Sequence, residues 1–292
     1  MEVNKCCLYV INTNLGQFVV ALENSLLRQS RRLFLKKIGE GTIIAATTVP
    51  LFSCLANQSS KMNRVLGYFE NYFGAKEITR LKEQNILLTI DDGPRINDTV
   101  VNIAEETSII NLEKGRKLQQ EILKYLTEHK IKAVFFWVGS RLEVALRDYN
   151  YRSQMINLVR KGFIVGNHCF THQPIFNLNA GEIISEIERT DKLIEELYRS
   201  AGVLRPIKLL RFPYRSRPKL MYKEEVYTFL NNLGYVIMYW SKDTKDWEHQ
   251  EVKQIDIELK NCLPGDIILI HENPRTLKFL SRICEQVAMQ EL

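Results

Sequence analysis

The stretch that decides the fold is ILLTIDDGPR, at residues 86 to 95. Its first half, ILLTI, is an apolar and partly β-branched run that is typical of a buried strand. The run ends in two adjacent carboxylates, Asp91 and Asp92, and a Gly-Pro pair follows them. Asp-Gly and Gly-Pro are common in turns, so this stretch taken alone favours a plain turn. The remaining strands of the chain decide whether the carboxylates also belong to a functional site.

Apolar runs of strand length alternate with amphipathic helical patterns after residue 85. The predicted strands lie at residues 86–91, 133–139, 163–168, 208–214, 235–240 and 266–272. Four glycines mark the returns from helix to strand, at Gly162, Gly202, Gly234 and Gly265. Strands that alternate with helices imply parallel pairing, and six or more repeats favour a barrel over an open sheet. We therefore predict one α/β barrel domain, with a long excursion at residues 95–116 near the tip of the first strand.

The composition is that of an ordinary globular protein, with 292 residues of which 45% are hydrophobic and 25% are charged. The net charge is +6, but residues 1–53 hold six Lys/Arg against three Asp/Glu, which leaves 34 basic and 31 acidic residues for the remainder. This small surplus argues against a nucleic-acid partner. The six cysteines have no CxxC or other metal-ribbon spacing, so we predict neither a disulfide framework nor a cysteine zinc site.

Residues 1–60 look like an extension and export signal, which leaves 61–292 as the folded domain. SRRLFLK, at 30–36, precedes an apolar stretch that is shorter than the roughly 18 to 20 residues needed to span a bilayer. The segment resembles a twin-arginine signal, which directs folded proteins across the bacterial inner membrane and implies a location in the periplasm or cell envelope. The LFSC box at its end resembles a lipoprotein cleavage site, with Cys54 as the acylated residue that anchors the protein to the membrane. Cleavage nearby by the ordinary signal peptidase is the alternative.

Polar side chains gather where the predicted strands end. They are Asp91 and Asp92 after the first strand, His168 and His172 after the third, Arg211 and Tyr214 after the fourth, Asp243, Asp246 and Trp247 after the fifth, and His271 at the end of the sixth. The C-terminal ends of barrel strands form one rim at which the loops converge, so we expect these side chains to lie together. Each has an ordinary structural explanation when taken singly, but jointly they predict a catalytic site.

Five short motifs carry these residues. They are TIDDGP (89–94), HCFTH (168–172), RFPY (211–214), DTKDW (243–247) and LIH (269–271). In this order they resemble the motifs of the polysaccharide deacetylases, the NodB-like carbohydrate esterases of family 4. Only Ile90 departs from the family pattern, which usually has Phe there. The resemblance implies a distorted (β/α) barrel and a hydrolase that removes acetyl groups from N-acetylated glycans such as peptidoglycan or a surface polysaccharide.

The resemblance also implies a metal centre. Asp92, His168 and His172 offer one oxygen and two nitrogens, a set that suits a catalytic divalent metal, above all Zn²⁺, with positions left for water and substrate. Histidines four apart can face the same way on a single turn, and Cys169 between them is then expected to point elsewhere. Such a metal lowers the pKa of its bound water and polarises the amide carbonyl of an N-acetyl group.

The remaining motif residues take their roles from the same resemblance. Asp91 corresponds to the family's general base, and Arg211 holds and tunes it. His271 corresponds to the general acid that protonates the leaving amine, and Asp246 keeps its imidazole protonated near neutral pH. The backbone N–H of Tyr214 is the implied partner of the metal in stabilising the oxyanion.

Several alternatives stay open. Trp247 lines the acetyl pocket or a sugar face, or else packs in the core, and Asp243 is expected to form a cap or a hydrogen bond. An O-acetyl-sugar esterase or a cyclic-amide hydrolase of the same fold is the nearest alternative function. A catalytically silent glycan-binding lipoprotein is the alternative of another class, although a silent copy is expected to lack at least one ligand.

Overall fold

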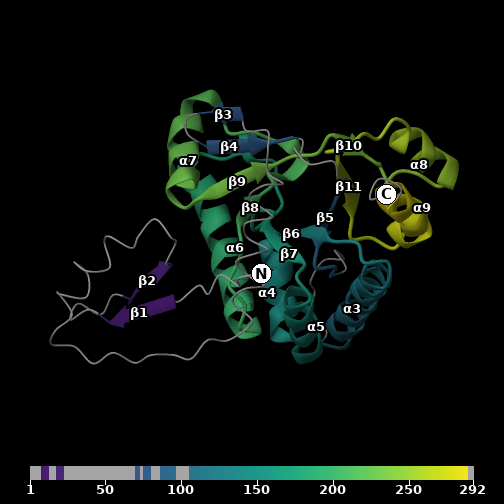
Figure 1. Ribbon diagram of the computed structural model, residues 1–292, viewed down its shortest axis with the longest axis horizontal. Coiled ribbons are helices and arrows are strands. Elements are labelled where there is room, and N and C mark those ends of the chain that lie inside the picture. The colour runs from purple at the N-terminus through teal and green to yellow at the C-terminus, as the bar shows by residue number, and fades with distance from the viewer. Residues whose placement is uncertain are drawn as a thin grey trace, which may run out of the picture. The chain divides into compact units, whose positions relative to one another are not determined.

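The computed structural model describes residues 8–12, 18–22, 70–72, 75–79, 86–96 and 105–288 (Figure 1). The chain divides into two compact units, Met1–Gln58 and Ser59–Leu292. In the first unit, β1 (Leu8–Asn12) pairs antiparallel with β2 (Phe18–Leu22). This hairpin was not predicted, although two apolar runs flanking TNLGQ are a signal for one. The twin-arginine motif and Cys54 lie outside the described residues.

The second unit is built on a curled, mostly parallel sheet. Its strands are β3 (Glu70–Tyr72), β4 (Ala75–Ile78), β5 (Leu87–Gly93), β6 (Ala133–Trp137), β7 (Ile164–Asn167), β8 (Lys208–Leu210), β9 (Tyr235–Met238), β10 (Lys242–Asp243) and β11 (Ile267–His271). They are ordered β10-β11-β5-β6-β7-β8-β9-β4-β3, and every neighbouring pair is parallel except β3 with β4. Because β10 and β3 are edges, the sheet formed by the described residues is a barrel that stays open on one side. The predicted distorted (β/α) barrel is confirmed.

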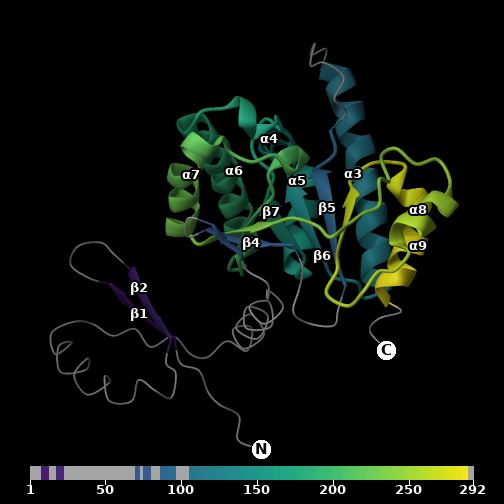
Figure 2. The same ribbon diagram turned by 90° about the horizontal axis from the view of Figure 1, so that it is seen from above.

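Helices cover the outer face of this sheet (Figure 2). They are α3 (Glu105–Glu128), α4 (Gly139–Arg147), α5 (Tyr149–Arg160), α6 (Ala180–Ala201), α7 (Leu220–Asn232), α8 (Val252–Leu259) and α9 (Thr276–Ala288), with short 3₁₀ turns η2 (Ile175–Asn177) and η3 (Pro213–Arg215). Neighbouring helices pack in the order α7, α6, α5, α3, α9, α8, which follows the order of the strands beneath them. None of the helices in the described part of the chain combines the length and the apolar character needed to cross a bilayer.

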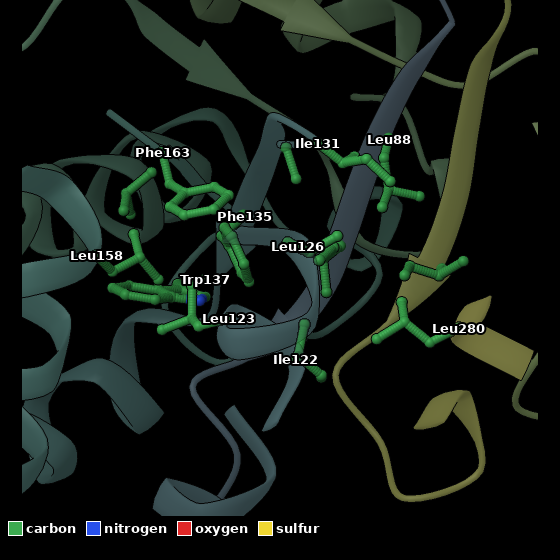
Figure 3. Packing of buried hydrophobic residues seen from close by; sticks show 14 of the residues in the cluster. Leu88, Ile122, Leu123, Leu126, Ile131, Phe135, Trp137, Leu158, Phe163 and Leu280 are labelled. Atoms are coloured by element: carbon green, nitrogen blue, oxygen red, sulfur yellow. The ribbon is translucent and has the colours of Figure 1, made fainter. Parts of the chain in front are cut away.

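Strand β6 shows why the central strands appear in the sequence as continuous apolar runs. Its five residues, AVFFW, are all buried. Phe135 and Trp137 face the helix layer, where Phe135 also meets the ring of Phe163 at 5.8 Å between centroids (Figure 3). Val134 and Phe136 face the barrel interior instead. Both faces of a central parallel strand are thus covered, and burial of each large side chain contributes about 1.5–3 kcal/mol.

Local signals set the helix ends. At the start of α6, Asn179 and Glu182 form a reciprocal capping box, and Gly202 ends the helix with a φ of 66°. Gly162, Gly234 and Gly265 also have positive φ, at 83°, 73° and 85°. The four predicted helix-to-strand glycines are therefore confirmed.

The element boundaries differ from the predicted ones near the rim. Strand β5 runs on to Gly93, so both carboxylates belong to the strand, with an irregularity in its pairing between Ile90 and Gly93. Helix α3 begins at Glu105, so the second half of the predicted 95–116 excursion is helical. The predicted strands at 208–214 and 235–240 end at Leu210 and Met238, because the following residues form rim loops. The short elements α4, β3, β4 and β10 were not predicted, since neighbouring strands and helices rather than local patterning define them.

Candidate metal centre and active site

Parallel register brings the polar residues to one edge of the sheet. His271 on β11 lies in register with Asp91 on β5. Asn167, the last residue of β7, is in register with Trp137 on β6 and with Leu210 on β8. The residues that follow β7 and β8 are therefore delivered to the same rim as the carboxylates of β5.

Asp92, His168 and His172 form the one group with metal-ligand chemistry found among the described residues, with a ligand atom from each within 4.8 Å of the others. The Oδ1 atom of Asp92 lies 2.8 Å from Nε2 of His172 and 3.4 Å from Nε2 of His168. Burial favours a raised pKa for the Asp92 carboxyl, but hydrogen bonds and positive charge from the two imidazoles hold that pKa well below its ordinary value. The Asp92 carboxylate is therefore ionised, the form that can bind a metal.

The imidazole of His168 is oriented by the backbone. Its Nδ1 lies 2.6 Å from the carbonyl oxygen of Arg211. A carbonyl only accepts, so Nδ1 carries a proton, and Nε2 is the nitrogen left to bind a metal when the imidazole is neutral. Nδ1 of His172 lies 3.3 Å from the hydroxyl of Tyr214, with Nε2 again toward Asp92. One carboxylate oxygen and two Nε2 atoms that converge in this way fit a divalent metal such as zinc.

Asp91 and Arg211 form a buried ion pair beside this group. Nη1 of Arg211 lies 2.7 Å from Oδ1 of Asp91 and also donates to the hydroxyl of Thr89. The other guanidinium nitrogens donate to the carbonyls of Met238 and Tyr239, so each nitrogen of the fully buried guanidinium has an acceptor. Oδ2 of Asp91 is left toward the metal ligands, 3.7 Å from Nε2 of His168.

His271 is held by a buried carboxylate. Its Nδ1 lies 2.8 Å from Oδ1 of Asp246, and its backbone N–H donates to Oδ2 of the same residue at 2.9 Å. Asp246 is fully buried and also accepts from the hydroxyl of Thr276. Burial disfavours the imidazolium, but the hydrogen bond and charge of Asp246, with further charge from Asp91 and Asp92, raise the pKa of His271 to about 9. The imidazole is therefore protonated at neutral pH, with Nε2 available.

Left-handed backbone is concentrated at the rim. Of the non-glycine residues with positive φ in the described chain, the rim loops hold Asp92 (68°), Cys169 (62°), His172 (61°), Tyr214 (56°), Arg215 (53°) and Lys245 (50°). Such conformations cost about 1–3 kcal/mol each and persist only where the surroundings enforce them. The expectation that His168 and His172 share a helical turn was wrong, because left-handed residues at 169 and 172 bend the segment instead. Cys169 is buried, free and outside the ligand group, as predicted.

Glu272 was missed by the sequence reading. This fully buried carboxyl accepts a hydrogen bond from the backbone N–H of Arg95 at 2.8 Å, while its own N–H donates to the carbonyl of Asp91. Glu272 is thereby hydrogen-bonded to residues at both ends of the DDGP turn, Asp91 and Arg95. A Cβ added at Gly93 would lie 2.2 Å from Oε2 of Glu272 and 2.7 Å from the indole of Trp137, so only glycine fits at this position. The signal for Glu272 was a charged residue directly after a buried strand.

The remaining motif residues have distinct positions. Trp247 is 53% exposed, so core packing was the wrong alternative for it. Tyr214 is 66% exposed and its ring lies 4.9 Å from that of His172. Asp243 accepts a hydrogen bond from the N–H of Lys245 at 3.0 Å, which confirms the local hydrogen-bonding role predicted for it.

Comparison with known proteins identifies relatives of the chain. A sequence model of the family described as polysaccharide deacetylase matches residues 79–238. The chain is 26% identical over 190 residues to the peptidoglycan-N-acetylglucosamine deacetylase of Bacillus cereus, with 65% of this chain and 56% of the relative covered. It is also 26% identical over 190 residues to a chitooligosaccharide deacetylase of Sinorhizobium fredii, with 64% and 72% covered. The chain thus spans little more than half the length of the Bacillus cereus relative.

Solved structures share the fold. A family 4 carbohydrate esterase from Streptomyces lividans, in complex with acetate, is 25% identical with a TM-score of 0.52, and the match covers 71% of this chain and 89% of that one. A pseudoenzyme of the same carbohydrate esterase family from Bacillus anthracis is 22% identical with a TM-score of 0.55, over 73% and 64% of the two chains. The second likeness concerns the fold alone.

Proposed function

The chain belongs to the polysaccharide deacetylase family, and we propose that residues 61–292 form a zinc-dependent hydrolase that removes acetyl groups from N-acetylated glycans. One observation carries this proposal. The ligand group Asp92, His168 and His172 lies beside a carboxylate held by a buried arginine, and His271, held by Asp246, is in register with that carboxylate. The donor set needed for a metal and the acid and base needed for amide hydrolysis are thus both present.

Asp91 is the proposed base. A divalent metal held by the three ligands supplies Lewis-acid polarisation of the acetyl carbonyl and acidifies water at the site. Oδ1 of Asp91 is occupied by Arg211, which leaves Oδ2, on the side of the metal ligands, to accept the proton of the attacking water. Tyr214 has a left-handed backbone, and its side-chain hydroxyl lies 3.3 Å from Nδ1 of His172. The backbone N–H of Tyr214 is the proposed donor to the oxyanion.

His271 is the proposed acid. When the carbon–nitrogen bond breaks, the leaving amine needs a proton, and an imidazolium with a pKa raised to about 9 carries one at neutral pH. Because Nδ1 is bonded to Asp246, the proton is delivered from Nε2. Acetate and a free amine on the glycan are the products, and Trp247 offers an exposed indole for packing against a sugar ring.

The names of the relatives support N-acetylated substrates, since they include peptidoglycan and chitooligosaccharide deacetylases. O-acetyl esters are the second candidate, because a relative from Pseudobutyrivibrio xylanivorans is a bifunctional xylanase/deacetylase, 27% identical over 210 residues. A silent glycan-binding protein is disfavoured by the complete ligand group and by the buried Asp91–Arg211 pair, which leaves Oδ2 of Asp91 on the side of that group. We also propose export by the twin-arginine route and membrane anchoring through Cys54, on the sequence motifs alone.

The test is acetate release from a panel of peptidoglycan, chitin oligomers, poly-N-acetylglucosamine and acetylxylan by the zinc-loaded protein. We expect release from at least one N-acetylated glycan. In His168→Ala and His172→Ala variants, we expect most bound metal and nearly all activity to be lost while the fold is retained, because these rim residues contribute little to the core. Release from acetylxylan alone favours the esterase, and release from no substrate favours the silent protein. Full metal occupancy in either variant contradicts the proposed metal site.

A further inference from the structure

A buried carboxylate on α6 holds the segment that joins the two histidine ligands. Glu186 is 7% exposed. Its Oε2 accepts the backbone N–H groups of Phe170 and Thr171 at 2.9 and 2.7 Å, and its Oε1 accepts the hydroxyl of Thr171 at 3.0 Å. Both acceptor oxygens are therefore directed at the residues between His168 and His172.

The same segment is held from its other side. The carbonyls of Cys169 and Phe170 accept hydrogen bonds from the N–H groups of Gly139 and Ser140, at 2.8 and 2.9 Å. Two helices thus hold the segment, with the carbonyls of Cys169 and Phe170 bonded to the start of α4 and the N–H groups of Phe170 and Thr171 bonded to Glu186 on α6. The N–H of Cys169 donates to Oδ1 of Asn167.

The segment needs this support because its backbone is strained. Cys169 and His172 both have left-handed conformations, with φ of 62° and 61°. Each costs about 1–3 kcal/mol in a non-glycine residue. Without the bonds to Glu186, the N–H groups of Phe170 and Thr171 lose their acceptor, and relaxation of the adjoining left-handed residues moves the imidazole of His172 relative to Asp92.

Glu186 has no role as an ion pair in the part of the chain that the structure describes. The ion pairs found there do not include it, and its oxygens are engaged by neutral donors. Its position on α6 is also unusual, since it lies on the buried face of the helix with Ile183, Ile187 and Thr190. A charged residue on the apolar face of an amphipathic helix signals a specific polar contact.

We propose that Glu186 is a positioning residue that sets the metal affinity of the site by holding residues 170 and 171 in the conformation that aims His168 and His172 at a common point. The inference rests on the proposed function, since it concerns the same metal. Partners of this kind behind metal ligands typically change metal affinity by about 10- to 100-fold when removed.

The experiment measures Zn²⁺ affinity of the metal-free protein by competition with a chromophoric chelator, for wild type and three variants. Glu186→Ala removes all three hydrogen bonds, and we expect affinity to fall by about 10- to 100-fold. Glu186→Gln can keep its oxygen on the two N–H groups and donate its amide to the Thr171 hydroxyl, so we expect it to bind within a few-fold of wild type. Glu188→Ala is the matched control, because Glu188 is exposed on the same helix two residues away.

A second readout separates positioning from general loss of stability. Hydrogen exchange of the Phe170 and Thr171 amides is expected to accelerate in metal-free Glu186→Ala and not in Glu186→Gln or Glu188→Ala. If Glu186→Ala fails to fold, Thr171→Ala removes one of the three bonds and is expected to weaken Zn²⁺ binding by a smaller factor. Wild-type affinity in both Glu186→Ala and Thr171→Ala, or equal losses in Glu186→Gln and Glu186→Ala, overturns the proposal. If the wild-type protein binds no Zn²⁺, the proposed metal centre itself is overturned. If the Glu186 variants change Zn²⁺ affinity in a protein without deacetylase activity, the role of Glu186 stands and only the proposed activity is contradicted.

Discussion

His271, the proposed general acid, is the residue at which amide and ester hydrolysis are expected to differ. It comes from a different strand than the metal ligands, and Asp246 fixes its ring without contributing to the ligand group. We expect His271→Ala to retain metal and to lose turnover of an N-acetyl glycan by about 10² to 10⁴, the usual worth of a positioned general acid. The loss on an activated aryl acetate should be smaller, because an aryl oxide leaves without a proton.

Steady-state kinetics on both substrates, with metal content measured in parallel, check this expectation. His249→Ala is the matched control, because His249 lies near Glu258 and outside the proposed machinery. Equal losses on both substrates, or loss of metal along with activity, show that His271 is not the acid.

Glu272 makes stability depend on pH. Burial raises its pKa to about 7, and the hydrogen bonds from Arg95 and Gln119 only partly oppose this. Between pH 4.5 and about 7, the Glu272 carboxyl therefore keeps a proton in the folded protein. In the unfolded chain it loses that proton near pH 4.5, its ordinary pKa. The associated stability is present below about pH 4.5 and is lost as the pH rises toward 7.

Glu272→Gln mimics the protonated form and should remove this dependence. We expect the variant to gain stability relative to wild type as the pH rises from 4.5 to 7, by on the order of 2–3 kcal/mol across that window. Urea unfolding of the metal-free proteins at several pH values measures the difference. A difference in unfolding free energy that stays constant between pH 4.5 and 7 contradicts a raised pKa for Glu272.

At the scale of elements, the sequence predicted the central strands and the gathering of polar residues at the rim. It did not predict the turns that depend on contacts with neighbouring strands and helices. Continuous apolar runs such as AVFFW identified the central strands, because both faces of a parallel sheet are buried. The carboxylates and histidines were predicted to meet because parallel strands end at one rim. The left-handed turn at His172 could not be predicted, because it depends on contacts from α4 and α6 rather than on local propensity.

The DDGP turn leaves no room for an added methyl group at Gly93. At Gly93 a Cβ meets the carboxylate of Glu272 and the indole of Trp137, both buried. We expect Gly93→Ala to cost about 1–3 kcal/mol of folding stability and to weaken metal binding, because Asp92 is the preceding residue. Thermal unfolding and Zn²⁺ titration measure the two effects.

Gly181→Ala supplies the comparison for that change. A Cβ at Gly181, in the first turn of α6, meets only Oδ1 of Asn179, at 3.5 Å. Alanine favours a helix by up to about 1 kcal/mol over glycine, so this variant should be neutral or more stable. Similar behaviour of the two variants would show that close packing at Gly93 is not what fixes the turn.

At the scale of the whole molecule, the residues of the proposed metal centre come together only in the folded chain. Asp92 comes from β5 and the histidines follow β7, with β6 and three helices between them in sequence. Metal binding at the proposed centre is therefore expected to be coupled to folding of the sheet. A route that exports folded proteins, as the twin-arginine motif implies, allows the site to assemble before the chain crosses the membrane.

Export and anchoring are then separable by substitution. Replacement of both Arg31 and Arg32 by Lys should leave the protein in the cytoplasm, because the twin-arginine route reads that pair, whereas Arg28→Lys, outside the motif, should be exported normally. Cys54→Ala should be exported but recovered in the soluble fraction, because it lacks the acyl chains, which contribute about 0.8 kcal/mol of membrane affinity per buried CH₂ group. Cys7→Ala is the control for this substitution. Cell fractionation followed by immunoblotting measures both outcomes. Normal export of the double-Lys variant contradicts the twin-arginine route, and membrane retention of Cys54→Ala contradicts the lipid anchor while leaving the catalytic proposal unaffected.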